Sequence, residues 1–95
     1  MKEAYIKIEG RVQSVGYRRW AMSKALEIGN IFGWVRNEFD GSVEILMNGD
    51  NDSVNMMIQA CYDGPLFARV DRILFLSKAK DSFLPSIIDG KFIII

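Results

Sequence analysis

The sequence predicts an α+β fold in which two helices cover one face of an antiparallel sheet. Three observations lead to this prediction. Several short segments alternate apolar and polar residues, as strands do, while two longer segments repeat apolar residues every three or four positions, as helices do. Glycine, proline, asparagine or aspartate stands at most boundaries between these segments. The resulting order is β-α-β-β-α-β with a short extra C-terminal strand, which is typical of the ferredoxin-like sandwich.

The first strand and the first helix flank a glycine-containing loop. Residues 4–9 predict the strand, because aliphatic side chains alternate along one face; these are Ala4, Ile6 and Ile8. Residues 17–28 predict the helix, because apolar side chains recur along one stripe. The stripe consists of Ala21, Met22, Ala25, Leu26 and Ile28. Gly29 and Asn30 end the helix, because both residues tolerate a positive φ.

A hairpin fills the middle of the chain. Residues 31–37 have high β propensity, with two aromatic side chains near their centre. Residues 42–48 alternate, with one face formed by Val43, Ile45 and Met47. Asp40 and Gly41 lie between the two segments and are typical of a hairpin turn.

The second helix and the last two strands complete the pattern. Asp50 and Asp52 are expected to cap a helix that runs to about residue 62. Its stripe has the i, i+3, i+4, i+7 spacing and consists of Val54, Met57, Ile58 and Cys61. Gly64 and Pro65 end it.

Two further strands are expected beyond the second helix. Residues 68–77 predict a strand whose apolar run, residues 73–76, is continuous, so we expect it to be covered on both faces. A loop at 78–90 and a short strand at 92–95 follow.

Composition bounds the class of protein. Ninety-five residues predict one domain, residues 1–95, and an apolar share of 49% is enough for a packed core. Twelve basic residues balance twelve acidic ones, whereas a nucleic-acid-binding protein is expected to have a basic excess. The chain has no histidine, which excludes serine–histidine and cysteine–histidine nucleophile systems.

The remaining composition bears on redox state, metals and location. A single cysteine, Cys61, excludes an internal disulfide and any cysteine-rich metal site, and it fits a reducing cytoplasm. Because it lies on a helix stripe, we expect it to be a buried, inert thiol. We expect no signal peptide, no membrane span, no metal and a monomer in the cytoplasm.

The loop between the first strand and the first helix has the composition of an anion site. Gly10–Arg18 reads Gly-Arg-Val-Gln-Ser-Val-Gly-Tyr-Arg and ends in the expected first turn of the helix. Backbone N–H groups at such a helix start, together with the helix dipole, favour a bound anion. The guanidinium of Arg18 can bind two phosphate oxygens at once. The stretch therefore predicts a phosphate cradle with one arginine.

Three motifs resemble the acylphosphatase family. Gly10–Arg18 resembles its signature, usually Gly-Arg-Val-Gln-Gly-Val-x-Phe-Arg. A second resemblance lies in Gly33–Asn37 followed by Asp40–Val43, and a third in Gly64–Pro65 followed by Ala68–Asp71. The motifs stand in the family's order at close to its spacing and span most of the chain. The resemblance implies the same α+β sandwich.

The resemblance also implies an activity and its residues. The activity is hydrolysis of a carboxyl–phosphate mixed anhydride to carboxylate and phosphate, with a small acylphosphate as substrate, phosphate as product or competitive inhibitor, and no cofactor. Arg18 would bind the phosphate and stabilise its charge, and Asn37 would position the attacking water. The phosphate-binding loop would supply backbone amides from Val12, Gln13, Ser14, Val15, Gly16 and Tyr17.

Several alternatives stay open. Ser14 stands where the family usually has glycine, so the domain could be a weakened relative that binds anions or a partner. A positive φ at Ser14 would cost about 1–2 kcal/mol. Without the resemblance, Asn37 is better explained as a turn residue and Arg19 as a solvated side chain. An RNA-binding module of similar topology is disfavoured, because no strand presents the exposed aromatics of such modules.

Overall fold

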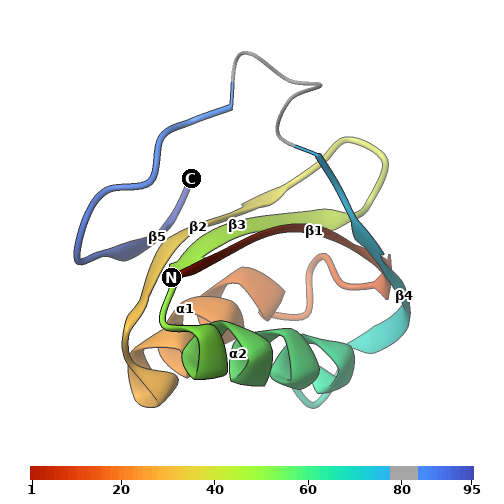
Figure 1. Ribbon diagram of the computed structural model, residues 1–95. Helices are drawn as coiled ribbons and strands as arrows, with labels where there is room; N and C mark the ends of the chain where they lie inside the picture. Colours follow the sequence, from red (N-terminus) through yellow and green to blue (C-terminus); the bar gives the residue numbers. More distant parts are fainter. Residues whose placement is uncertain (78–83) are drawn as a thin grey trace.

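The structure is a computed structural model that describes residues 1–77 and 84–95. Two helices pack on one face of a five-stranded sheet (Figure 1). The elements in chain order are β1 (Lys2–Arg11), α1 (Tyr17–Ile28), β2 (Ile31–Asn37), β3 (Val43–Gly49), α2 (Asn51–Asp63), β4 (Arg69–Phe75) and β5 (Phe92–Ile94). The ferredoxin-like order expected from the sequence is therefore confirmed. Residues 78–83, the beginning of the loop expected at 78–90, lie outside the described residues.

The sheet has the strand order β4-β1-β3-β2-β5. The neighbours among β1 to β4 are antiparallel, but β5 pairs with β2 in parallel, with Gly33 opposite Phe92 and Val35 opposite Ile94. The sheet is thus mixed: the four strands of the β-α-β-β-α-β pattern are antiparallel as expected, and the extra C-terminal strand, whose direction the sequence did not predict, is parallel to its neighbour. A parallel neighbour requires a long connection, and the chain between β4 and β5 provides one.

The main core lies between the sheet and the helices. The predicted faces of the first and third strands are buried there, as is the whole predicted stripe of α2. Asp50 caps α2 by accepting a hydrogen bond from the Ser53 backbone N–H, as expected. Gly29 and Asn30, after α1, have positive φ values of 81° and 58°, which confirms the predicted helix end.

Two apolar helix side chains point outward, and one of them, Leu26, belongs to the predicted stripe of the first helix. Leu26 is 71% exposed and Met56 is 57% exposed. Leu26 is next to the buried Ala25, and Met56 is next to the buried Met57. Because successive helix residues are rotated by about 100°, these neighbours of buried residues point toward solvent. In α1 the buried stripe is narrower than predicted and consists of Tyr17, Ala21 and Ala25.

The strand β4 differs most from its prediction. It is an edge strand, and Ile73 is its one buried residue, while Phe75 is 61% exposed. The expectation that this run is covered on both faces is wrong. The run is continuous because Ile73 faces the helices, whereas Leu76, just beyond the strand, packs with a second cluster on the other face of the sheet.

This second cluster covers part of the face opposite the helices. Tyr5, Trp34 and Leu46 form its buried centre, and residues from the C-terminal segment pack against them. The Trp34 indole N–H donates to the Pro85 carbonyl oxygen at 2.9 Å. Trp34 is therefore a core residue of this second cluster. No helix in the described part of the chain is long and apolar enough to cross a bilayer.

Candidate active site

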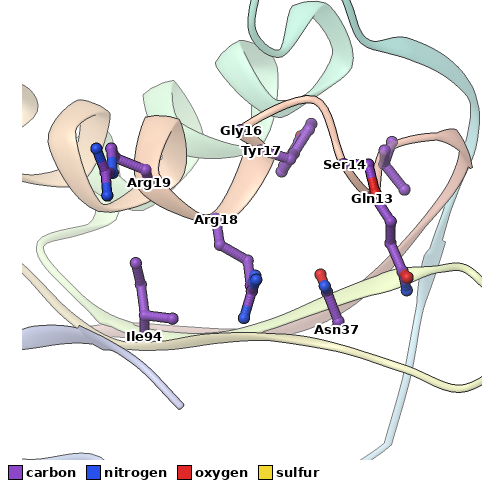
Figure 2. Close-up of a pocket in the computed structure, with 9 residues that line it drawn as sticks. Gln13, Ser14, Gly16, Tyr17, Arg18, Arg19, Asn37 and Ile94 are labelled. Atoms are coloured by element: carbon purple, nitrogen blue, oxygen red, sulfur yellow. The ribbon is translucent and has the colours of Figure 1, made fainter.

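The loop between β1 and α1 opens into a cavity of about 390 Å³. The loop and the first turn of α1 form one side of it, and the ends of β2 and β5 form the other (Figure 2). The lining residues are Val12, Gln13, Ser14, Gly16, Tyr17, Arg18, Arg19, Asn37 and Ile94. Ligand pockets in proteins range from about 300 to 1,000 Å³, so this one is large enough for a small molecule.

Gly10 starts the loop at a point of close backbone contact. The β1–β4 register shifts between Glu9 and Gly10, and a Cβ atom at Gly10 would lie 2.1 Å from the Arg69 carbonyl oxygen. Since Gly10 also has a φ of 137°, a larger residue would displace the edge strand or the loop. Glycine therefore sets the position from which the loop leaves the sheet.

The start of α1 is open to the cavity. Its N-cap, Gly16, is in the left-handed region with φ 80° and has no side chain to accept a hydrogen bond from the first N–H groups of the helix. No acidic residue lies in the first turn. By contrast, α2 begins with the Asp50 cap and has Asp52 in its first turn. The N–H groups and positive dipole end of α1 thus face a cavity that can receive an anion.

Arg18 and Asn37 approach this opening from two elements. Figure 2 shows the Arg18 side chain extending from α1 toward the sheet, beside Asn37 at the end of β2. Arg18 is exposed, and in residues 1–77 and 84–95 it forms no ion pair. Its guanidinium is therefore available to an external anion.

Gln13 fastens the loop to the hairpin that carries Asn37. Its side-chain N–H group donates to the carbonyl oxygens of Glu38 and Ser42, at 2.7 and 2.9 Å. Both acceptors belong to the β2–β3 connection. The Gln13 side chain therefore fixes the distance between the β1–α1 loop and the hairpin. The sequence assigned Gln13 only a backbone role in the loop.

The other predicted loop residues differ in what they present. The side chains of Val12 and Tyr17 are buried, and the Tyr17 hydroxyl donates to the Cys61 carbonyl oxygen at 2.6 Å. Val15 is outside the lining set and packs its side chain against the core. Ser14 is exposed and has a φ of 63°, the positive value considered for it from the sequence.

Two lining residues were not predicted. Ile94, in β5, reaches the cavity because β5 pairs with β2, a contact between segments about sixty residues apart that no local sequence pattern reveals. Arg19 is exposed, as expected of a solvated side chain, yet it also lines the cavity. In Figure 2 its side chain points away from Arg18.

The electrostatics of the cavity favour anions. Among the described residues that line it are two arginines and no carboxylate. Nearby acidic groups are engaged elsewhere: Glu44 contacts Arg36 at 3.1 Å, and Lys7 pairs with Asp40 and holds the pKa of that carboxyl below its usual range. The pKa of Glu38 is raised, first by burial and then by Glu44. No group of three or more histidine, cysteine, aspartate or glutamate residues that could hold a metal occurs within the described ranges.

Comparisons with known proteins agree with this geometry. The family model described as Acylphosphatase matches residues 4–86. An acylphosphatase of Nitrobacter winogradskyi is 53% identical over 68 residues, covering 72% of this chain and 68% of that protein. An acylphosphatase of Alcanivorax borkumensis is 47% identical over 74 residues, covering 78% and 79%. The crystal structure of an acylphosphatase from Bacillus subtilis superposes with a TM-score of 0.82 at 31% identity, covering 100% of this chain and 99% of that one.

Proposed function

The chain belongs to the acylphosphatase family of hydrolases, and from this premise we propose how its own residues cleave a carboxyl–phosphate mixed anhydride. One observation carries the proposal. An uncapped helix start, the Arg18 guanidinium and the amide of Asn37 line one cavity, and among the residues that the structure describes Arg18 has no ion-pair partner and no carboxylate lines the cavity. These groups can hold a phosphoryl group on one side and a water molecule on the other.

The reaction is a displacement at phosphorus. The oxygen of water forms a new bond to phosphorus, and the bond from phosphorus to the acyl oxygen breaks, with its electron pair leaving on the carboxylate. A phosphoryl oxygen of the substrate takes the proton from water. An acyl phosphate dianion and water thus yield a carboxylate and dihydrogen phosphate. Since the leaving carboxylate is already a stable anion, no general acid is required, which fits a chain without histidine.

Arg18 and the loop amides bind the phosphoryl oxygens. The transition state of phosphoryl transfer is loose, so catalysis depends mostly on positioning and on charge stabilisation. The bidentate guanidinium and the N–H groups at the start of α1 supply fixed positive charge where the phosphoryl oxygens lie.

Asn37 positions the water. Its amide oxygen can accept a hydrogen bond from water and its amide nitrogen can donate one, which fixes the orientation of the water without acting as a base. The end of β2 holds Asn37 rigidly, because the residue pairs with Val43 in the hairpin. Fixed orientation of two reactants is worth several powers of ten in rate.

Other properties follow from the same proposal. Residues 1–95 act as a single domain that works as a monomer in the cytoplasm, without metal or cofactor.

The alternative is a domain whose catalysis is weakened by Ser14 and which acts as an anion- or partner-binding module. The φ of 63° at Ser14 favours the enzyme, because the serine adopts the backbone region that a glycine would use and leaves the loop open.

Hydrolysis of benzoyl phosphate in excess EDTA tests the proposal. We expect turnover that EDTA does not change, and competitive inhibition by inorganic phosphate. Absence of hydrolysis with retained phosphate binding would favour the binding module. Loss of activity on chelation, restored by a divalent ion, would contradict the metal-free mechanism.

A further inference from the structure

The cavity continues past the phosphate-binding groups toward β5. In Figure 2 Arg18 lies between Asn37 on one side and Ile94 on the other, with Arg19 above Ile94. Strand pairing supports this order: Ile94 lies opposite Val35, and Asn37 is two residues further along β2, roughly 7 Å along the strand. Asn37 and Ile94 therefore mark two ends of one cavity.

The β5 end of the cavity differs in chemistry from the Asn37 end. Ile94 is an aliphatic side chain with 37% of its surface exposed, next to the cavity. Arg19 brings a second guanidinium, and within the described residues it makes no ion pair. One arginine suffices to grip the phosphoryl group, so the second charge and the aliphatic wall are left for another part of the ligand.

The in-line geometry of the reaction indicates which part of the substrate lies beside Ile94 and Arg19. In phosphoryl transfer the attacking and leaving oxygens lie roughly in line through phosphorus. If Asn37 holds the water and Arg18 holds the phosphoryl group, the acyl oxygen must leave on the side of phosphorus away from Asn37. This is the side on which Ile94 and Arg19 lie.

We infer that Ile94 and Arg19 form the subsite for the acyl group, an inference that rests on the function proposed above. The hydrocarbon body of the acyl group packs on Ile94, and Arg19 pairs with an anionic substituent on that body. The favoured substrates are acyl phosphates with an apolar body and a second anionic group, such as a carboxylate.

A neighbouring groove is the competing location. It has a volume of about 300 Å³ and is lined by Gln13, Asn37, Glu38 and Phe39. Gln13 and Asn37 also line the main cavity, and Glu38 and Phe39 follow Asn37 in the chain, away from Val35 and its partner Ile94. Phe39 is fully exposed there and offers an apolar surface. However, this groove lies on the water side of Asn37, and the Glu38 carboxylate would repel an anionic acyl group. Substitution of Phe39 therefore distinguishes the two locations.

The first experiment varies only the charge of the acyl group. Benzoyl phosphate and 4-carboxybenzoyl phosphate share the phosphate and the ring, and differ by one carboxylate. We expect Arg19→Gln to lower kcat/KM for the carboxylated substrate relative to benzoyl phosphate about fivefold at low salt, mainly through KM, as an exposed ion pair provides. The effect should shrink as salt increases. Lys91→Gln, which removes an exposed charge outside the cavity, should leave the ratio unchanged.

The second experiment varies the apolar body. We expect Ile94→Ala to lower kcat/KM for benzoyl phosphate about threefold more than for acetyl phosphate, because less hydrocarbon is buried against the smaller side chain. Phe39→Ala should leave this ratio unchanged. Circular dichroism of each variant confirms that the fold is kept.

The outcomes separate the inference from the function on which it rests. Equal losses for both substrates in Arg19→Gln would mean that Arg19 serves the phosphate, and would overturn the subsite. A change of ratio in Phe39→Ala with none in Ile94→Ala would move the acyl group to the other groove and also overturn it. If the unsubstituted protein cleaves none of these substrates, the proposed function itself fails.

Discussion

The side-chain nitrogen of Gln13 lies 2.7 Å from the carbonyl oxygen of Glu38 and donates a hydrogen bond to it. The loop is therefore hydrogen-bonded to the residue that follows Asn37. The same group reaches the Ser42 carbonyl oxygen at 2.9 Å. A single side chain thus joins the loop to the hairpin, next to Asn37. Gln13 is therefore a positioning residue, and its contribution should appear in turnover.

Gln13→Ala should lower kcat about tenfold or more with little change in phosphate inhibition, because small displacements of reacting groups are costly. The free energy of unfolding should fall by about 1–2 kcal/mol, since two part-buried carbonyl groups lose a donor. Gln13→Glu should be worse, because an ionised carboxylate has no proton to donate. Unchanged kcat in a folded Gln13→Ala protein would contradict the positioning role.

Ser14→Gly should stabilise the protein slightly. Ser14 holds a φ of 63°, which costs an L-residue about 1–2 kcal/mol, and glycine removes this strain while gaining entropy in the unfolded chain. The net gain should be below that amount, with turnover equal or higher. Thermal unfolding measures it, and Asn30→Gly is the matched control, because asparagine at φ 58° is already tolerant of this region. A fall in both stability and turnover would show that serine suits the loop.

Asn37→Ala should lower kcat by about 10² or more while the inhibition constant of phosphate stays nearly the same, because Asn37 is assigned to water and Arg18 to phosphate. Steady-state kinetics with phosphate as competitor measure both quantities. Should phosphate binding weaken as much as turnover falls, Asn37 would have to be reassigned to the phosphate.

Cys61 should make stability depend on pH in the alkaline range. Burial raises the pKa of its thiol from 9.0 to about 12. A group whose pKa is raised by folding stabilises the native state below its unfolded pKa and loses this contribution as pH rises toward the folded pKa. The free energy of unfolding should therefore fall by up to about 1.4 kcal/mol per pH unit above pH 9 from this group.

Urea unfolding at pH 8 to 11 measures this slope. Tyr17, whose pKa burial also raises, adds to the decline above pH 10, so Cys61→Ala is needed to isolate the thiol and should have a shallower slope. Ellman's reagent at pH 8 should label the native thiol far more slowly than the unfolded one. Fast labelling of the native protein would contradict the burial.

The elements that local patterns could predict are those whose neighbours lie close in sequence. Residues 17–28 form a helix and residues 31–37 form a strand, as expected. The signals that predicted them are the apolar stripe of the helix, its end at Gly29–Asn30 and the aromatic residues of the strand, and each of these depends only on residues close together in the sequence. The first strand was predicted two residues too short at each end, since Lys2 and Arg11 pair with distant strands that no local window contains.

Long-range pairing explains what the sequence could not predict. The parallel β2–β5 contact brings Ile94 to the cavity, and the C-terminal segment covers Trp34 on the face opposite the helices. The same applies to the site. The motif resemblance pointed to Arg18 and Asn37, but the Gln13 hydrogen bonds and the place of Arg19 depend on how the loop and hairpin meet.

The central claim is that Arg18 grips the phosphoryl group of an acylphosphate, and steady-state hydrolysis of benzoyl phosphate by Arg18→Ala and Arg18→Lys tests it most directly. We expect Arg18→Ala to lose at least ~10² in kcat/KM and Arg18→Lys to recover little, because an ammonium group cannot form the bidentate contact. Phosphate inhibition should weaken in both variants. Turnover like that of the unsubstituted protein in a correctly folded Arg18→Ala variant would contradict the claim.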